Sequence, residues 1–337
     1  MSISWGTIDK VDDNKSDYTN ADYNKSDYNN ADYSKADYNK AEHMTPSMIR
    51  EAVRAGAIRP QKSLGQNFLI DQSYAERIAE AADVGPDDTV IEVGPGLCAL
   101  TRPLCRRAGH VVAVEIDRFL VPQILQEMRG AQNFRLVHGD ILKTPLDELL
   151  PDGAARHSPY KVVSNLPYSI SSQVMMRFFE GFGEVDRPSV MVLMMQKEVA
   201  DRLVAQPATK AYGSLTVAAN VHSAPRRAFS VPPHCFVPQP GVDSTVVVLE
   251  TRPEPPAPIE DRKLFAKVVR AAFAQRRKTL ENCLMHAGLL PQDRIEAAAT
   301  LAEAGVRPGA RGETLTVEEF ADVANAIAAR SVGERRE

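Results

Sequence analysis

The chain has few of the residues and segments that mark secreted, membrane or metal-binding proteins. Its 337 residues include one tryptophan and four cysteines, and the cysteines show no metal-ligand spacing. No apolar run is long enough for a signal sequence or a membrane span. The sequence therefore predicts a protein of the reducing cytoplasm that holds no metal and spans no membrane. The cysteines are Cys98, Cys105, Cys235 and Cys283.

An excess of positive charge is also missing. Asp and Glu number 44 against 40 Lys and Arg, which gives a formal net charge of −4. Residues 1–43 hold nine acids and five lysines, so the rest of the chain is neutral. Affinity for a nucleic acid must therefore come from a localised basic surface.

The composition of residues 1–43 differs from that of the rest of the chain. Five Asp-Tyr pairs recur every five residues among Asn, Ser, Ala and Lys, with almost no aliphatic side chains. Five short units cannot bury a core, so the segment predicts a low-complexity, disordered tail. We expect Met44 to be the natural start and the tail to be an upstream extension or a translated repeat.

After the tail, the chain is long enough for one large and one small domain. Apolar runs alternate with helix-like segments, which is typical of an α/β fold. We predict a Rossmann-like domain over residues 44–252 and a small C-terminal helical domain over residues 259–330. Beyond the first strands, we expect strands at 188–196, 215–221, 228–231 and 244–250, and helices at 261–287, 292–304 and 317–329.

A strand, a glycine turn and a helix follow one another from Thr89 to Ala108. The β-branched run Thr89–Val93 leads into Gly94-Pro95-Gly96, and residues 99–108 have a helical pattern. Glycines let the backbone approach a ligand, and the turn presents free N–H groups. A glycine pair alone is weak evidence, but no lysine follows it and no second glycine set marks a pyrophosphate site. A nucleoside cofactor without phosphates, such as S-adenosylmethionine, fits better.

Single acids end the next two strands. Glu115 follows the strand at 110–114 and lies 21 positions after Gly94, where an acid is placed to bind a ribose diol. Asp140 follows the strand at 134–137 and is placed to accept from an exocyclic amine. Either acid alone could equally be a solvated surface residue, but both in register favour a nucleoside site.

The fourth strand ends in Asn165-Leu166-Pro167-Tyr168. Asn165 offers an amide oxygen, Pro167 restricts Leu166 to extended conformations, and Tyr168 offers a ring on which a base can stack. Asn-x-Pro is also an ordinary turn, so the context decides between the two interpretations. Four successive strand endings of this kind favour a pocket for an adenine.

A basic segment lies near the C-terminal end. Residues 262–280 contain seven basic side chains and no acid. A basic helix face is usually just solvated, yet its occurrence in a chain with an adenine pocket favours phosphate contact. The residues predicted to bind RNA are Lys267, Arg270, Arg276, Arg277 and Lys278.

From Lys62 to about Asn282 the sequence resembles the ribosomal RNA adenine N6-dimethyltransferases. The matching motifs are Gly65–Leu69, Glu92–Gly96, Glu115, Gly139-Asp140, Asn165–Tyr168, Gln196–Ala200, Val231–Pro233 and Ala272–Leu280. The resemblance implies a class I methyltransferase fold and S-adenosylmethionine as the methyl donor. It also implies dimethylation of two adjacent adenosines in a 3'-terminal hairpin of small-subunit RNA. The implied substrate is this rRNA or an immature small subunit, and the implied enzyme is a monomer.

The resemblance also implies roles for single residues. Asn67, Leu69 and Gly94 line the methionine side of the cofactor, Glu115 holds the ribose and Asp140 contacts the cofactor adenine. Glu92 either orients the methionine portion or serves the packing of the glycine turn. The residues assigned to the target base are Asn165, Leu166, Pro167 and Tyr168. Those assigned to the cofactor are Gln66, Asn67, Leu69, Glu92, Gly94, Gly96, Glu115, Asp140, Ile141 and Asn165.

Two positions depart from the family pattern. Cys98 stands where a third glycine is usual, and its thiol would make activity sensitive to alkylation if it is exposed and ionised. Gly241 stands where a lysine is frequent. Two alternatives to small-subunit dimethylation stay open. The first is a large-subunit enzyme of the macrolide-resistance type, which resembles this chain in the cofactor turns and the Asn-x-Pro-aromatic motif. The second, suggested by Cys98, is a ribosome assembly factor with weak or lost catalysis.

Overall fold

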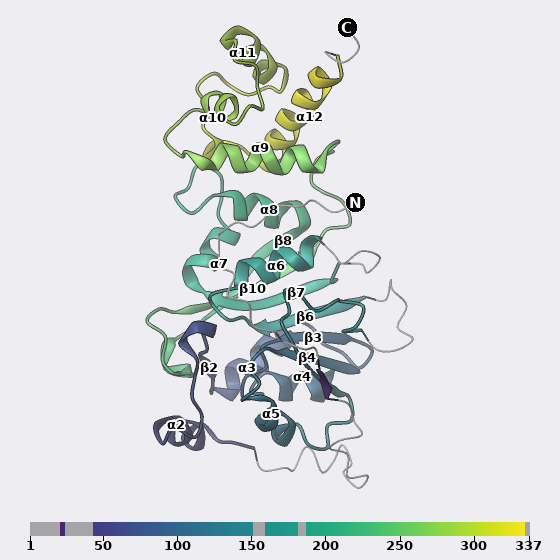
Figure 1. Ribbon diagram of the computed structural model, residues 1–337, viewed down its shortest axis with the longest axis vertical. Helices are drawn as coiled ribbons and strands as arrows, with labels where there is room; N and C mark the ends of the chain where they lie inside the picture. Colours follow the sequence, from purple (N-terminus) through teal and green to yellow (C-terminus); the bar gives the residue numbers. More distant parts are fainter. Residues whose placement is uncertain (1–20, 24–42, 151–158, 181–186, 334–337) are drawn as a thin grey trace. The chain divides into compact units, whose positions relative to one another are not determined.

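The computed structural model describes residues 21–23, 43–150, 159–180 and 187–333, which divide into two compact units (Figure 1). The larger unit comprises the described residues up to Ala200 together with Arg226–Thr251. The smaller unit comprises Asp201–Pro225 and residues 252–333. Residues 201–225 therefore group with the C-terminal helices, although the sequence analysis places them in the Rossmann-like domain.

The larger unit is built on an eight-stranded sheet in the order β1-β5-β4-β3-β6-β7-β10-β8. From β5 to β7 the neighbouring strands are parallel, and β10 is antiparallel to β7. This topology confirms the predicted Rossmann-like fold class. The strands are β1 (Ala21–Tyr23), β3 (Thr89–Val93), β4 (His110–Glu115), β5 (Phe134–His138), β6 (Tyr160–Asn165), β7 (Val190–Gln196), β8 (Ser223–Val231) and β10 (Ser244–Thr251), and a separate pair joins β2 (Phe68–Leu69) to β9 (Phe236–Val237).

The central strands form the core of this unit. Val90 and Ile91 of β3 are fully buried, and residues 111–114 of β4 are at most 2% exposed. Parallel strands that are covered on both faces have continuous apolar sequences, as these two have.

The helices of the two units, in chain order, are α2 (Pro46–Arg54), α3 (Gln72–Ala81), α4 (Thr101–Arg107), α5 (Val121–Glu127), α6 (Ser171–Glu180), α7 (Lys197–Leu203), α8 (Ser214–His222), α9 (Arg262–Ala274), α10 (Leu280–His286), α11 (Arg294–Glu303) and α12 (Val317–Gly333).

Several helices begin at a side chain that accepts from their first backbone N–H groups. Such caps satisfy donors that have no partner inside the helix, and each stabilises the helix by about 1 kcal/mol. The capping residues are Thr45 for α2, Asp71 for α3, Asp261 for α9, Thr279 for α10 and Asp293 for α11.

Two predicted elements are wrong. Residues 215–221 form helix α8 and not a strand. Nearly every residue of α8 is buried, and a short apolar run without periodicity does not distinguish a buried strand from a buried helix. The single helix expected at 261–287 is two helices, because α9 ends at Ala274 and the Thr279 cap begins α10.

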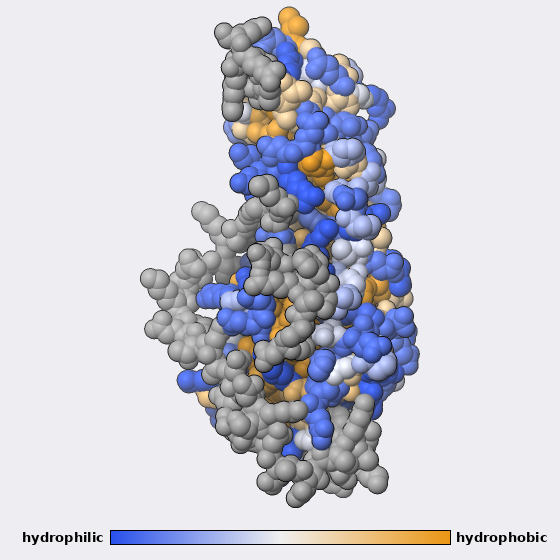
Figure 2. Space-filling model, turned by 90° about the vertical axis from the view of Figure 1, so that its right-hand side faces the viewer, coloured by the Kyte–Doolittle hydropathy of each residue, from blue (hydrophilic) through white to orange (hydrophobic). Residues whose placement is uncertain are grey.

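The predicted disorder of residues 1–43 falls almost wholly outside the described residues. Within this segment, Ala21–Tyr23 forms strand β1, which pairs antiparallel with β5. No helix of the described residues is both long and apolar enough to cross a membrane. Hydrophilic side chains predominate on the described part of the face seen in Figure 2.

Candidate active site

A cavity of about 260 Å³ lies at the carboxyl ends of the parallel strands. There β3 neighbours β6, although β4 and β5 come between them in the chain. Open α/β sheets bind their ligands at such a reversal of strand order. The cavity wall includes all the residues that the sequence analysis assigns to the cofactor or the target base. They are Gln66, Asn67, Leu69, Glu92, Gly94, Gly96, Glu115, Asp140, Ile141, Asn165, Leu166, Pro167 and Tyr168.

The glycine turn after β3 brings bare backbone to the cavity. Gly94 and Gly96 have left-handed conformations, with φ of 67° and 56°. A Cβ atom at Gly96 would lie 3.0 Å from the Phe68 ring, and one at Gly94 would lie 3.6 Å from Pro167. Larger residues here would strain the backbone and crowd the cavity wall. The turn therefore has the bare backbone that close approach of a ligand would require.

Cys98 extends the left-handed turn with φ of 60°, a conformation that is uncommon outside glycine. Its side chain is fully buried, and burial raises the pKa of the thiol well above its usual value. The conditions for alkylation, exposure and ionisation, are thus not met. The turn keeps its glycine-like shape although a side chain replaces the usual third glycine.

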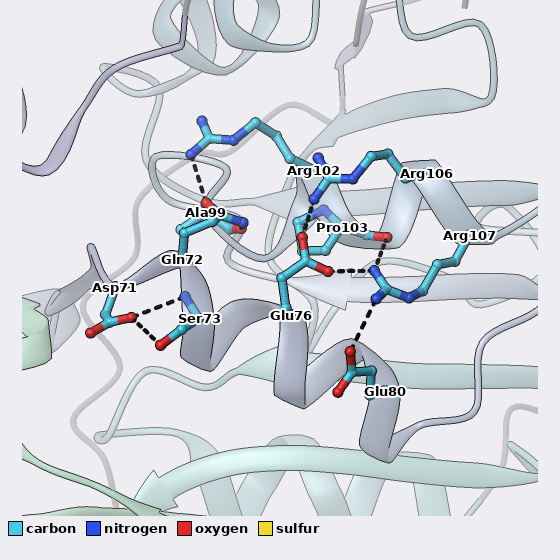
Figure 3. A network of polar contacts seen from close by, with 10 residues as sticks. All are labelled: Asp71, Gln72, Ser73, Glu76, Glu80, Ala99, Arg102, Pro103, Arg106 and Arg107. Carbon is cyan, nitrogen blue, oxygen red and sulfur yellow. Dashed lines mark hydrogen bonds and ion pairs between the residues drawn. The ribbon is translucent and has the colours of Figure 1, made fainter.

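Polar contacts join helices α3 and α4, each of which comes shortly after a segment of the cavity wall in the chain (Figure 3). The Glu76 carboxylate of α3 pairs with Arg106 and Arg107 of α4, at 2.6 Å in the case of Arg107. The Gln72 side-chain amide donates to the Ala99 carbonyl at 3.3 Å. Because α3 follows the N-terminal wall and α4 follows the glycine turn, these contacts hold the two walls together.

The buried carboxyl groups in the cavity wall give the site its electrostatic character. Glu92 is 1% exposed, and burial, together with the nearby Glu115, raises its pKa to about 8. Burial likewise raises the pKa of Glu115 to about 7. The Oε2 atom of Glu92 has no hydrogen-bond partner among the described residues. Three acids and no Lys, Arg or His line the described cavity, so the site suits a cation and not a phosphate.

Hydrogen bonds link Glu115 to the N-terminal wall of the cavity. The Asp117 N–H donates to Glu115 Oε1 at 2.9 Å, and Gln66 Nε2 donates to Asp117 Oδ2 at 2.9 Å. Gln66 Oε1 accepts from the Gln61 N–H at 2.8 Å. Sequence reasoning did not identify Asp117, and its only signal is an acid two residues after a strand end.

Asp140 both lines the cavity and shapes the turn behind it. Its Oδ1 atom accepts from the Leu142 N–H at 2.9 Å, and its Oδ2 atom lies 3.7 Å from the Lys143 ammonium. An acid held in such a turn keeps a carboxylate oxygen at the cavity edge, where an exocyclic amine could donate to it.

At the end of β6 the amide of Asn165 has a defined orientation. Its Nδ2 atom donates to the Asn67 carbonyl at 3.3 Å. Leu166 follows, and its N–H donates to the Met194 carbonyl of β7 at 3.0 Å. Because the amide nitrogen donates to Asn67, the side-chain oxygen of Asn165 can accept a hydrogen bond from a ligand.

The phenol of Tyr168 contacts strand β10. Its hydroxyl lies 2.7 Å from the Ser244 Oγ atom at the start of β10. Ser244 is fully buried and was not among the predicted site residues. No signal local to Ser244 identifies it, since the contact depends on the pairing of β7 with β10.

Comparison with known proteins decides the family. A family model described as ribosomal RNA adenine dimethylase matches residues 58–329. The chain belongs to this family. A protein of Moorella thermoacetica named ribosomal RNA small subunit methyltransferase A is 44% identical over 287 residues, covering 84% of this chain and 98% of the relative. A protein of the same name from Alkaliphilus metalliredigens is 42% identical over 287 residues, covering 85% of this chain and 98% of the relative.

Two solved structures agree with the fold. The crystal structure of the 23S rRNA methyltransferase ErmE is 28% identical with a TM-score of 0.58, covering 78% of this chain and 100% of that chain. The crystal structure of a dimethyladenosine transferase from Plasmodium falciparum is 22% identical with a TM-score of 0.63, covering 77% of this chain and 97% of that chain. The second comparison concerns the fold alone. The resemblance and enzyme class predicted from the motifs are confirmed.

The basic residues predicted to bind RNA lie in the smaller unit of this dimethylase. Lys267 and Arg270 are exposed on α9, and Arg277 and Lys278 are exposed after it. Arg276 has several partners within the unit. Its guanidinium bonds Glu313 at 3.1 Å and donates to the carbonyls of residues 210 and 212 at 2.8 and 3.3 Å. Arg276 is therefore committed to intramolecular contacts.

Proposed function

We propose that this dimethylase transfers methyl groups from S-adenosylmethionine to the N6 amines of two adjacent adenosines in a 3'-terminal hairpin of small-subunit rRNA. The observation that carries the proposal is the oriented Asn165 amide at the edge of an acid-lined cavity. Small-subunit RNA is favoured because the relatives with 44% and 42% identity are named for it. The resemblance to ErmE is weaker, at 28% identity.

The cavity suits S-adenosylmethionine in charge and in shape. When bound, this cofactor supplies a methyl group on a positively charged sulfur. The unpartnered Glu92 oxygen would accept from the cofactor's amino group, and Glu115 from its ribose hydroxyls. The Gly94–Gly96 backbone allows the close approach that a bulky wall would prevent. Asp140 would accept from the adenine amine.

The target base would meet the residues that follow β6. The N6 lone pair of adenine is conjugated with the ring, which makes it a weak nucleophile. The Asn165 side-chain oxygen and the Leu166 carbonyl would accept hydrogen bonds from its two N–H groups and so favour a tetrahedral nitrogen. After each transfer the methylated nitrogen would release one proton to water. Tyr168 would stack on the base and keep it in line with the methyl group. Positioning and fixed dipoles then supply most of the acceleration.

The smaller unit would bind the RNA backbone. Lys267, Arg270, Arg277 and Lys278 present positive charge that can contact phosphates. The target adenine must leave its stack, at a cost of a few kcal/mol, and such contacts offset that cost. We further propose that the protein acts as a monomer in the cytoplasm and that its substrate is an immature small subunit.

Product analysis tests this function. The purified protein and labelled S-adenosylmethionine are incubated with undermethylated small subunits and, separately, with large subunits. Mass spectrometry of the digested RNA then identifies the modified nucleosides. We expect dimethyladenosine from small subunits only. Label on large subunits would instead favour a resistance-type enzyme, and RNA binding without any methylated product would favour an assembly factor.

A further inference from the structure

Strand β10 contacts a residue of the cavity wall through Ser244. Ser244 is the first residue of β10, and its hydroxyl lies 2.7 Å from the Tyr168 hydroxyl. The serine is fully buried, so this contact is not exchanged for water. Of the residues around the cavity, Tyr168 is the one expected to stack on the target base.

The backbone around Ser244 is held firmly by β7. Ser244 pairs with Gln196, the last residue of β7, and the Lys197 N–H donates to the Asp243 carbonyl at 3.0 Å. On its other edge β7 pairs with β6, which ends in Asn165. The sheet order β6-β7-β10 therefore places Asn165 and Ser244 on strands either side of β7.

This arrangement holds the Tyr168 side chain at both ends. The backbone leaves β6 and passes the rigid Pro167, while the phenol is bound to β10. A tyrosine with a free hydroxyl could turn about its side-chain torsions, and each rotamer would present a different plane to a base. Burial raises the pKa of the Tyr168 phenol, so the hydroxyl keeps its proton at neutral pH.

We propose that Ser244 is a positioning residue that fixes the ring plane of Tyr168 for stacking on the target adenine. The proposal rests on the proposed function, because it assigns Ser244 a part in presenting the base. Ser244 touches neither the cofactor nor the reacting nitrogen. Its loss should therefore slow methyl transfer without weakening cofactor binding.

The neighbouring residue provides a matched control. Thr245 is also fully buried on β10, and its hydroxyl has no hydrogen-bond partner among the described residues. Thr245→Val removes a buried hydroxyl at the same depth without touching Tyr168. Successive side chains of a strand point to opposite faces, so Thr245 points away from the side of the sheet that Ser244 occupies.

The experiment is a double-mutant cycle on the full chain. The variants are Ser244→Ala, Tyr168→Phe and the double variant, with Ser244→Thr as the conservative replacement and Thr245→Val as the control. We expect Ser244→Ala and Tyr168→Phe each to lower kcat by about tenfold, the value of one lost hydrogen bond. The double variant should be no slower than either single variant, because both remove the same bond. Ser244→Thr should recover most of the rate, and affinity for S-adenosylhomocysteine should not change.

A fluorescence measurement follows the ring without requiring methyl transfer. An RNA carrying 2-aminopurine in place of the target adenine is bound in the presence of S-adenosylhomocysteine. We expect stacking on Tyr168 to quench the fluorescence in the wild type and in Thr245→Val, and the quenching to fall in Ser244→Ala. Equal quenching in all variants, no quenching in the wild type, or multiplicative losses of kcat in the cycle would overturn the proposal. Absence of dimethyladenosine with normal quenching would instead contradict the proposed function.

Discussion

The side-chain amide of Gln66 donates to the carboxylate of Asp117 at 2.9 Å, although the two residues are 51 positions apart in the chain. Asp117 is 3% exposed and also donates its N–H to Glu115. The pair therefore joins the N-terminal wall of the cavity to the acid assigned to the cofactor ribose. Gln66, which is predicted to contact the cofactor and lines the cavity, also links these two parts of the site.

Removal of this link should weaken cofactor binding. In Gln66→Ala the buried Asp117 carboxylate loses a donor, and the N-terminal wall loses its attachment. We expect the Kd for S-adenosylhomocysteine, measured by calorimetry, to rise by roughly tenfold. Gln123→Ala, which removes a glutamine whose amide donates to the Met44 sulfur, is the matched control and should leave the Kd unchanged. Equal Kd values for Gln66→Ala and the wild type would show that the link does not shape the site.

The buried Glu92 should make the cofactor-free protein less stable at alkaline pH. Its pKa is about 8 in the folded state against 4.5 for an ordinary glutamate, so folding favours the protonated form. The stabilisation is present below about 4.5 and is lost as the pH rises through 8. Glu92→Gln, which stays neutral, should exceed the wild type in free energy of unfolding by an amount that grows from pH 4.5 to pH 8.

Chemical denaturation at several pH values measures this difference. Glu51→Gln makes the same charge change on the exposed face of α2 and should have little effect at any pH. Above pH 8, where Glu92 is ionised, the Gln variant should also bind S-adenosylmethionine more weakly than the wild type, because it cannot offset the positive charge of the ligand. A difference between Glu92→Gln and the wild type that is independent of pH would contradict the assigned titration.

The left-handed backbone at Cys98 predicts an unusual order of substitutions. Glycine adopts this conformation freely, so Cys98→Gly loses side-chain burial but relieves strain of about 1–2 kcal/mol. We expect its free energy of unfolding to lie within about 1 kcal/mol of the wild type. Cys98→Val should destabilise by about 2 kcal/mol or more, since a β-branched residue is strained there and overfills a closed site. Similar losses in both variants would mean that the backbone is not strained at this position.

Arg276 and Arg277 should differ although they are adjacent and identical in type. Arg276→Ala breaks the contacts with Glu313 and the two carbonyls, so we expect the melting temperature to fall by several degrees. Arg277→Ala should leave the melting temperature unchanged, weaken RNA binding and reduce the salt dependence of the affinity by about one phosphate contact. Thermal denaturation, together with RNA-binding measurements at three salt concentrations, distinguishes the effects of the two substitutions. Identical effects of both substitutions would refute the distinction.

The sequence predicted the parts of the site that depend on strand endings. Glu115, Asp140 and Asn165 lie at the ends of successive parallel strands, and such ends meet at one edge of a sheet. The order of strands and acids along the chain was therefore enough to group these residues in one site. The same argument covers the Gly94–Gly96 turn, because φ above zero is a property of the local chain.

Other parts could not be predicted because they depend on contacts between distant segments. Ser244 lies 76 positions after Tyr168, and nothing beside it indicates a partner. The same holds for Arg276, whose sequence context is that of an RNA-binding residue and whose partners come from two distant segments, residues 210–212 and Glu313. Helix α8 was missed because burial on all sides removes the periodicity by which a helix is distinguished from a strand.

The most direct test of the account is single-turnover methyl transfer by Asn165→Ala on small subunits. The substitution removes the amide oxygen that should accept from N6, and its other contact is one hydrogen bond to the Asn67 carbonyl. We predict a rate at least about 100-fold lower, as for the loss of one oriented group at a reacting atom, with RNA binding retained. A rate close to that of the wild type would contradict the assignment of the target pocket.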